Sequence, residues 1–519
     1  MFLYAFVSLA AFAIISAACF LFKDMEICHE KATDHVVSIL IAIAACITFD
    51  LFPFNRMDPA FDASVFVYIA QRMHEGYVPY RDIFDHKGPV LYLIHYIGLF
   101  AGKTGIWFLE LVTMYWSSFF IIKLSSLLTE KRIISYLTSF GTLAALGMNI
   151  YDGGDFTEFW SLPWIIGSLY VFVKFIKTKE YANIGIFLTG ISFAIVFLLR
   201  VNNAVLWVFV LPCACIMLIK LKRSSEILRC ALLFSGGALS VATPTLLYLV
   251  ISGALDDFIE YYLVFNMAYT GHHSISEMIE CISSMFFYIE TGVFFIAASV
   301  FVSFLRRRYR LITVFNLVLF VLSLFAAVIS VRQFGHYLII VLQFFAVPIS
   351  ICLDAVYSIK WPKASESAKQ REGFLFPVIM YASLMIIIIS GMIITCQDTD
   401  TEKKDSMAEY VNLNTLPDDD VFIVSANPYT YLKTGRHTDN KFFFQSALNN
   451  DVLFEEFKKE LERVPSDRYL IEGVYHDGNT GTGIAGYLEA WCSDNGYLLE
   501  QHDGFYAFVK PRPEVDPSS

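Results

Sequence analysis

The chain has 519 residues, of which 56% are hydrophobic and 17% charged, and its formal net charge is -11. This composition is too apolar for a set of soluble domains and indicates a polytopic protein of the cell membrane, with the lipid bilayer as its surroundings. The net negative charge, without any basic cluster typical of a groove-binding face, argues against a nucleic-acid partner. The ten cysteines have neither metal-ligand nor disulfide spacing.

Apolar windows long enough to cross a hydrocarbon core of roughly 30 Å recur up to Cys396. The first window, residues 2–22, has no basic segment before it and no clear cleavage site, so we expect a retained span rather than a signal peptide. Residues 89–128 hold a short and a long apolar run, which predict one broken crossing with a re-entrant or interfacial piece. In total we expect about 11–13 transmembrane helices. The other predicted spans are residues 36–54, 133–150, 156–173, 181–199, 204–219, 229–252, 283–304, 311–330, 336–353 and 374–396.

Lysines and arginines cluster in some of the short loops, and this bias predicts the orientation of the spans. The clusters lie at residues 131–132, 174–179, 220–223 and 306–310, which we expect on the cytoplasmic side. The remaining loops, with the whole C-terminal tail, are then expected to be extracytoplasmic.

The composition changes abruptly after residue 397. This change predicts a membrane domain at 1–397 and a soluble domain at 398–519. Residues 421–425, 469–474 and 505–509 have the β-branched and aromatic composition of strands, and 452–463 has the apolar spacing of a helix. The expected fold class is an all-α polytopic membrane domain with a C-terminal soluble α/β domain.

The densest polar stretch lies between two apolar segments, at residues 55–88. Asp62 stands just ahead of a helical run at 64–73, and Asp85 and Lys87 follow a turn rich in Gly and Pro. A polar loop held against a bilayer is the first place where chemistry is expected. For Asp62 a simpler role is open as well, because Asp ahead of a helix is a common N-cap.

Further ionisable residues lie at the predicted outward ends of apolar helices: Asp155, Glu158, Arg200, Arg332 and His336. Such groups are costly in a membrane and are functional candidates by default. Solvated carboxylates and arginines that reach the headgroups are the alternative for each one alone. The spacing of Arg332 and His336 predicts that both lie on one helical face.

The first loop combines an acidic residue at its start, Asp62, with an aromatic helix, Gly76 and the exit Phe84-x-x-Lys87-x-Pro89. In this frame, and in the segments listed next, the chain resembles the GT-C superfamily of polyprenyl-phosphate-dependent membrane glycosyltransferases, especially the bacterial branch of protein O-mannosyltransferases and aminoarabinose transferases. Asp62-Ala63 stands where that superfamily commonly has an Asp-Glu pair. The other similar segments, in chain order, are residues 154–158, 197–202, 258–266, 332–337 and 421–436.

The resemblance implies an inverting enzyme that moves a sugar from a polyprenyl-phosphate donor to an acceptor hydroxyl of the cell envelope, on the extracytoplasmic face. Asp62 would be the catalytic base, which takes the proton of the acceptor hydroxyl. Cations in a water-poor cleft stabilise a leaving phosphate. The residues that would bind this phosphate are Lys87, Arg200, Arg332 and His336.

Asp155 and Glu158 would bind sugar hydroxyls or orient the base, and Asp85 and Tyr269 complete the predicted substrate-binding set. Together with Asp62, the first two could hold a divalent metal, but no spacing selects one, so a reaction without a cofactor is expected. Tyr269, with Tyr261 and Tyr262, fits an interfacial aromatic belt or a platform on which a sugar ring stacks.

Two other classes of function compete with the enzyme. A transporter or flippase of lipid-linked glycans would share the hydrophobicity and the cations. It should also carry charge midway along several helices and show paired broken helices in two halves, and neither is evident in the sequence. A membrane scaffold that displays the tail would have no use for the polar loop 55–88.

Overall fold

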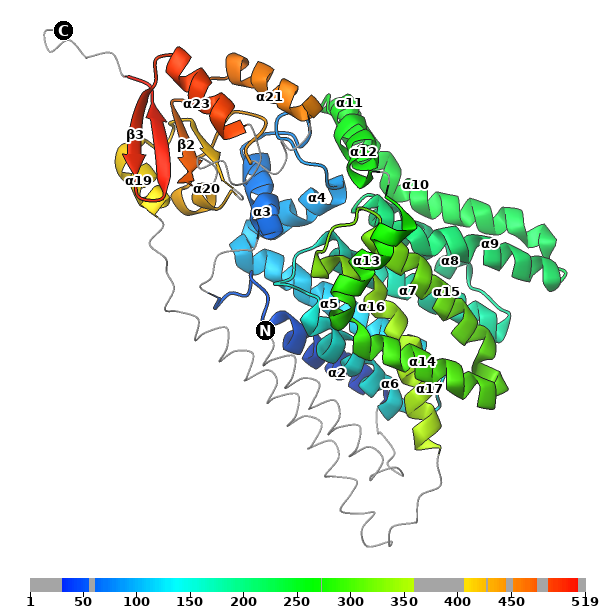
Figure 1. The fold of residues 1–519 in the computed structure, drawn as a ribbon. Helices are drawn as coiled ribbons and strands as arrows, with labels where there is room; N and C mark the ends of the chain where they lie inside the picture. Colours follow the sequence, from blue (N-terminus) through cyan, green and yellow to red (C-terminus); the bar gives the residue numbers. More distant parts are fainter. Residues whose placement is uncertain are drawn as a thin grey trace, which may run out of the picture. The chain divides into compact units, whose positions relative to one another are not determined.

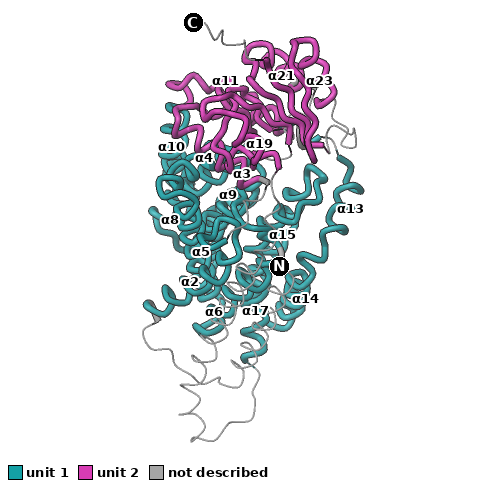
Figure 2. Tube along the Cα trace, turned by 90° about the vertical axis from the view of Figure 1, so that its left-hand side faces the viewer, with its two compact units in different colours: residues 1–56, 87–248, 267–398 teal, residues 57–86, 249–266, 399–519 magenta. Residues whose placement is uncertain are grey.

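The computed structural model describes residues 30–55, 61–271, 273–358, 406–425, 428–444, 451–473 and 484–511, so the predicted spans 2–22 and 374–396 lie outside this part. The chain divides into two compact units (Figure 2). Unit 1 comprises residues 1–56, 87–248 and 267–398, and unit 2 comprises residues 57–86, 249–266 and 399–519. Compactness divides the chain differently from the change of composition at residue 397, because two loop segments belong with the tail.

Unit 1 is a helical bundle over its described residues (Figure 1). Its α-helices are α2 (Glu30–Cys46), α4 (Pro89–Gly98), α5 (Gly102–Ser126), α6 (Arg132–Ser139), α7 (Thr157–Thr178), α8 (Asn183–Phe197), α9 (Val205–Lys220), α10 (Ile227–Ile251), α13 (Ile275–Met285), α14 (Glu290–Leu305), α15 (Arg310–Val328), α16 (Ile339–Leu342) and α17 (Ala346–Tyr357). A π-helical turn lies at Phe140–Leu146, and 3-10 turns lie at Leu99–Ala101, Gly147–Asn149, Val201–Ala204, Ser224–Glu226, Phe286–Tyr288, Arg307–Tyr309, Gly335–Leu338 and Gln343–Phe345.

Six helical segments among the described residues are long and apolar enough to cross a membrane, and a seventh is added if the pair α13 and α14, bent by 96°, counts as one span. The chain is therefore a multi-pass membrane protein, as its composition predicts. The expected break within 89–128 is present, because a 3-10 turn separates α4 from α5 and Gly102 has a φ of 63°.

Some predicted spans have other bounds. The helix α2 ends at Cys46 rather than at residue 54, and residues 132–149 form three helical pieces instead of one helix. The α2 and α8 helices are apolar but shorter than the six candidate spans.

The helices α8 and α10 approach each other closely through two glycines. A Cβ atom at Gly190 would clash with the carbonyl of Phe234, and one at Gly237 would clash with the carbonyl of Phe187. Small residues permit such close approach between membrane helices, where packing rather than the hydrophobic effect drives association.

The four basic loops gather at one end of unit 1. Lys177 donates a hydrogen bond to the carbonyl of Leu127, in the first basic loop, and Arg223 donates to the carbonyl of Lys179 at 2.8 Å. The 306–310 cluster lines the same cavity as residues of the first basic loop. The charge pattern thus correctly predicts that these loops share a side.

Unit 2 combines helices with a four-stranded sheet of order β1-β2-β4-β3. The β1 and β2 strands are parallel, and the other pairs are antiparallel. Its elements are α3 (Phe61–His74), α11 (Leu255–Phe258), the π-helical turn Ile259–Val264, α19 (Ser406–Asn414), α20 (Tyr429–Thr434), α21 (Asp451–Arg463), α23 (Ile484–Asp494), β1 (Val421–Val424), β2 (Arg468–Glu472), β3 (Leu498–His502) and β4 (Phe505–Val509). The α12 helix (Phe265–Thr270) begins in unit 2 and ends in unit 1.

Helices cover both faces of the sheet. Phe422 and Phe508 share one face through their register across β2, and Phe422 packs on Phe457 of α21 with ring centroids 5.6 Å apart. Phe505 points to the opposite face because strand side chains alternate, and it packs on Tyr410 of α19 at 5.3 Å. The predicted strands and the predicted helix at 452–463 are confirmed, while β3 was not expected.

Phe84 joins the three segments of unit 2. Its fully buried ring packs on Tyr261 at 4.8 Å and on Phe442 at 5.3 Å, and its N–H donates to the carbonyl of Lys441 at 2.9 Å. The two loop segments and the tail therefore lie on the same side of the membrane. Tyr261 and Tyr262 are buried, so the expectation of an interfacial belt is wrong for these two residues.

Candidate functional site

An ion pair between Glu158 and Arg200 marks one end of the unit 1 bundle, which we call the Glu158 end. Glu158 lies in the first turn of α7, its side chain is 3% exposed, and the hydroxyl of Thr157 donates to its second carboxylate oxygen at 2.9 Å. The positive end of the α7 dipole favours a carboxylate at this position. The guanidinium of Arg200 also lies over the ring of Tyr337, 4.2 Å from the centroid. A cation is thus held in a fixed place by an acid and an aromatic ring.

Lys87 and Arg200 occupy neighbouring backbone positions. The N–H of Gly88 donates to the carbonyl of Leu199 at 3.2 Å, so the start of α4 meets the end of α8 and each satisfies open backbone groups of the other. A Cβ atom at Gly88 would clash with the carbonyl of Leu198, and this close approach requires glycine. Two of the four cations predicted to bind phosphate are thereby brought to one place.

His336 belongs to the same end of the bundle. Its ring stacks on Phe156 with centroids 3.8 Å apart and planes 6° apart, and its Nδ1 lies 3.7 Å from Oδ2 of Asp152. Asp152 and Phe156 flank the loop before α7, so His336 ties the start of α16 to that loop. The residue lies next to Tyr337, which carries the Arg200 guanidinium on its ring.

The predicted shared helical face of Arg332 and His336 is wrong. Residues 331–334 are not helical, Val331 has a φ of 49°, and the 3-10 turn begins only at Gly335. The i, i+4 relation holds only within a helix. Arg332 is exposed, and its carbonyl accepts a hydrogen bond from the Cys281 thiol of α13 at 3.6 Å.

Asp155 is enclosed rather than open to a ligand. It is fully buried, its Oδ1 accepts a hydrogen bond from Trp160 Nε1 at 2.9 Å, and its Oδ2 lies 2.9 Å from His95 Nε2. The other ring nitrogen of His95 donates to the carbonyl of Leu91 at 2.9 Å. Asp155 therefore fastens the 151–155 loop to α4 and α7, which is a structural role that its sequence position did not indicate.

The 151–155 loop passes against two further acids that the sequence reasoning missed, the half-buried Asp50 and the buried Glu110. Gly153 and Gly154 have φ values of 90° and 86°, and a Cβ atom on them would meet Asp50 and Glu110 respectively. Glu110 lies within the long apolar run of α5, and His95 lies within α4. Glu110 and His95 could have been found from the sequence, because each is an ionisable residue inside an apolar helix.

Asp62 and Asp85 lie in unit 2. Asp62 is half-buried inside the first turn of α3, so it is not the N-cap of that helix. The helix is anchored by Tyr68, whose ring packs on Tyr431 at 4.9 Å. Asp85 is buried, and its Oδ1 accepts from the N–H of His86 at 2.7 Å.

Tyr269 lies in α12, and its side chain is outside the described residues. The structure thus brings Lys87, Glu158, Arg200 and His336 together within unit 1. It places Asp155 in buried contacts with His95 and Trp160, and its predicted contact with a sugar stays a prediction. It leaves Arg332 on the loop beside α13.

A polar cavity of about 530 Å³ lies within unit 2, where the first loop meets the tail. Its wall includes Asp82, which accepts two hydrogen bonds from Arg81 at 2.8 and 2.7 Å and one from the N–H of Val78 at 2.8 Å. Burial would raise the pKa of the Asp82 carboxyl, but these bonds outweigh it and hold the pKa below its usual value. The complete lining is Glu75, Gly76, Tyr77, Arg81, Asp82, Asp439, Lys441, Glu460 and Arg463.

Within the part of the chain that the structure describes, no group of three or more His, Cys, Asp or Glu side chains could hold a metal ion. Of the three acids that could have done so, Glu158 is held by Arg200 and Asp155 by Trp160 and His95. That no metal is needed stays a prediction.

Comparisons with known proteins establish the fold and the family. No curated protein matches the chain. The crystal structure of ArnT from Cupriavidus metallidurans bound to undecaprenyl phosphate is similar over 92% of this chain and 99% of that chain, with a TM-score of 0.59 and 11% identity. A crystal structure of the Archaeoglobus fulgidus oligosaccharyltransferase is similar over 91% of this chain and 73% of that chain, with a TM-score of 0.44 and 13% identity. Residues 25–407 match the family described as "Putative competence-induced protein Ccs4 N-terminal domain". The chain belongs to that family and has the GT-C fold.

Proposed function

We propose that this protein is an integral-membrane inverting glycosyltransferase that moves a sugar from a polyprenyl-phosphate donor to an acceptor hydroxyl of the cell envelope, on the extracytoplasmic face. The observation that carries the proposal is the likeness to ArnT, which was crystallised bound to undecaprenyl phosphate and whose whole length this chain covers almost completely.

The residues of the Glu158 end support a phosphate site. Arg200 is held in place by Glu158 and Tyr337, Lys87 is its backbone neighbour, and His336 lies next to Tyr337. A cation whose position is already fixed stabilises a phosphate without the entropy loss of ordering a long side chain. We assign the leaving phosphate to Lys87, Arg200 and His336, and Arg332 remains a fourth candidate from the loop before α16.

Asp62 is the proposed base. Its carboxylate takes the proton of the acceptor hydroxyl while that oxygen attacks the anomeric carbon, and the bond between this carbon and the phosphate oxygen breaks. The polyprenyl phosphate leaves as an anion, so no general acid is required, and we propose that no metal is needed. Asp85 and Tyr269 stay proposed substrate contacts.

Purified protein incubated with a panel of radiolabelled polyprenyl-phosphate sugars and crude envelope acceptors tests the proposal. The wild type should transfer label from one donor. Asp62→Asn should lower transfer by about 10²- to 10⁴-fold, since that is the usual contribution of a general base. Asp82→Asn is the matched control, because it removes a carboxylate of the same loop that has no assigned role in the reaction.

Full transfer by Asp62→Asn at wild-type abundance would exclude Asp62 as the base. If the wild type transfers no label but moves a lipid-linked sugar across the bilayer of a proteoliposome, the protein is a flippase instead.

Cysteine labelling in intact cells tests the proposed orientation. Asp152, whose side chain is 63% exposed at the Glu158 end, should be labelled from outside after replacement by cysteine. Lys220, at the opposite end of the bundle, should be labelled only after permeabilisation. The reverse pattern would place the donor site on the cytoplasmic face.

A further inference from the structure

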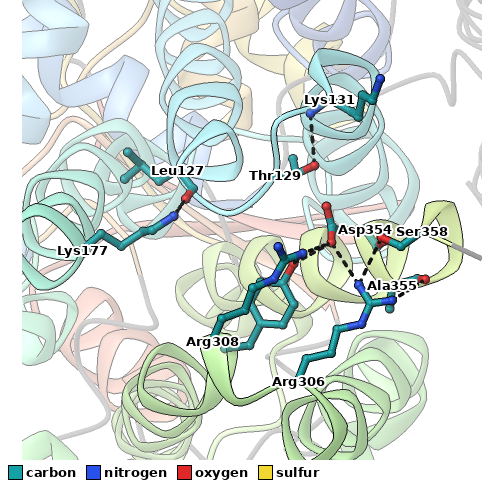
Figure 3. A network of polar contacts seen from close by, with 10 residues as sticks. Leu127, Thr129, Lys131, Lys177, Arg306, Arg308, Asp354, Ala355 and Ser358 are labelled. Atoms are coloured by element: carbon teal, nitrogen blue, oxygen red, sulfur yellow. Dashed lines mark hydrogen bonds and ion pairs between the residues drawn. The ribbon is translucent and has the colours of Figure 1, made fainter. Parts of the chain in front are cut away.

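A second charged cavity lies at the end of the bundle where the basic loops gather, which we call the Lys177 end (Figure 3). It has a volume of about 380 Å³ and is walled by residues of α5, α7, α15 and α17 and of the loops next to them. Its charged lining consists of Glu130, Lys131, Lys177, Arg308 and Asp354.

Two acids line the cavity, Glu130 and Asp354, and Asp354 is already engaged. Asp354 Oδ2 accepts hydrogen bonds from Arg308 at 2.6 Å and from the Tyr309 hydroxyl at 2.6 Å, and Arg306 approaches it at 3.4 Å, as Figure 3 shows for the two arginines. Two guanidinium groups on one carboxylate leave an excess of positive charge. Lys131 and Lys177 add two positive charges, against one negative charge from Glu130. The charge of Lys177 is not neutralised by its hydrogen bond, because the carbonyl of Leu127 is neutral.

Part of the cationic character is explained by the fold alone. The cavity lies where α5, α7 and α17 end, and cations are favourable near the negative ends of helix dipoles. That role requires contact with the last carbonyls, which Lys177 makes with Leu127 and Arg306 with Ala355 at 3.2 Å. The interaction with helix dipoles does not require an open space between the cations, so it does not explain the cavity.

The wall of the cavity is amphipathic. Leu127, Leu128 and Ile312 line it beside the cations, together with the rings of Tyr309 and Tyr357. Basic cavities between transmembrane helices, with apolar surface next to them, bind the headgroups of anionic lipids. A soluble anion would gain little from the apolar part of this wall.

We propose that this cavity binds the phosphate of an anionic phospholipid from the leaflet at the Lys177 end, with Lys131, Lys177 and Arg308 as its cations. The site is distinct from the proposed donor site, because α7 spans 22 residues from Thr157 to Thr178, which is roughly 33 Å of helix. The inference does not depend on glycosyl transfer.

The double variant Lys131→Gln/Lys177→Gln tests the proposal, since it leaves Asp354 with both arginines. The matched control is Lys174→Gln/Lys220→Gln, which removes the same charge from exposed lysines near the same end that do not line the cavity. Each protein is purified in a neutral detergent, and the binding of phosphatidylglycerol and of phosphatidylcholine is measured by native mass spectrometry. The wild type and the control should bind phosphatidylglycerol more tightly than phosphatidylcholine.

The double variant should bind phosphatidylglycerol about 30-fold more weakly, because each lysine near a lipid surface contributes roughly a fivefold change in affinity. Unchanged thermal unfolding of the variant shows that it is folded. Equal loss in the control, unaltered binding in the double variant, or equal affinity of the wild type for both lipids would overturn the proposal. Displacement of phosphatidylglycerol by millimolar inorganic phosphate would also overturn it, since the cavity would then be a site for a soluble anion.

Discussion

The two ends of α7 differ in how their charged side chains are paired. At its first turn, Glu158 is 3% exposed and paired with one arginine, next to a loop that glycines bend through left-handed conformations. At its last turn, Lys177 joins arginines that are 32% and 60% exposed and share one carboxylate around a cavity. The helix dipole favours an acid at the first end and a base at the second. The buried Glu158 is paired with one arginine, whereas the more exposed Asp354 is shared by two.

The largest loss of stability should come from breaking the ion pair between Glu158 and Arg200. Arg200→Ala leaves the Glu158 carboxylate buried without its cation, which we expect to lower the free energy of unfolding by about 3–5 kcal/mol. Denaturant titration in detergent measures the loss. The double variant Glu158→Gln/Arg200→Gln should regain a large part of it, because neither charge then remains buried. A loss below about 1 kcal/mol for Arg200→Ala would mean that the pair is solvated like a surface pair.

The next largest effect should come from the close packing of α8 against α10. Gly237→Ala should lower the free energy of unfolding by about 1–3 kcal/mol, since the new methyl group would clash with the carbonyl of Phe187. Gly236→Ala is the control on the same helix, where the nearest atom to the new methyl group lies 3.8 Å away. Thermal unfolding in detergent should show a loss for Gly237→Ala alone. Equal losses in both would indicate a general effect of substitution in α10.

A smaller effect is expected at the Lys177 end. Arg308→Gln should lower the free energy of unfolding by only about 0.2–1 kcal/mol, because this guanidinium is mostly exposed and Arg306 stays beside Asp354. The same denaturant titration compares it with Arg200→Ala. Equal losses in the two variants would remove the distinction between the ends.

The smallest effect should appear outside the bundle, in unit 2. Since the folded pKa of Asp82 is lowered, its contribution to stability is present above the unfolded pKa of about 4 and is lost as the pH falls through the folded value. Unfolding temperatures measured between pH 7 and pH 3 should therefore converge for the wild type and Asp82→Asn at the acid end. If the difference in unfolding temperature between the two proteins grows toward low pH, the pKa of Asp82 is raised on folding rather than lowered.

Many local features were predictable. Apolar runs, the basic loops and the strands of the tail each follow from residues adjacent in sequence. The third strand of the sheet was missed because all its residues from Leu498 to Gln501 are exposed and show no alternation. Asp503-Gly504, a frequent hairpin turn ahead of the expected strand at 505–509, was the signal that could have revealed it.

The candidate site was predictable only in part. Glu158, Arg200 and His336 were found because ionisable groups at the ends of apolar helices are conspicuous. Their partners were not: the enclosure of Asp155 depends on His95 from another helix, 60 positions away in the sequence. The misplaced helical face of Arg332 has the same origin, because spacing alone does not reveal where a helix begins.

By itself the sequence determined the membrane class of this protein, the shared side of its basic loops and most elements of the tail, since each depends on composition or periodicity within a short window. Only the tertiary structure decided that residues 57–86 and 249–266 share a core with the tail, that Gly88 brings Lys87 beside Arg200, and that cations surround a cavity at the Lys177 end. These features are contacts between residues distant in sequence, and packing, not local preference, selects them.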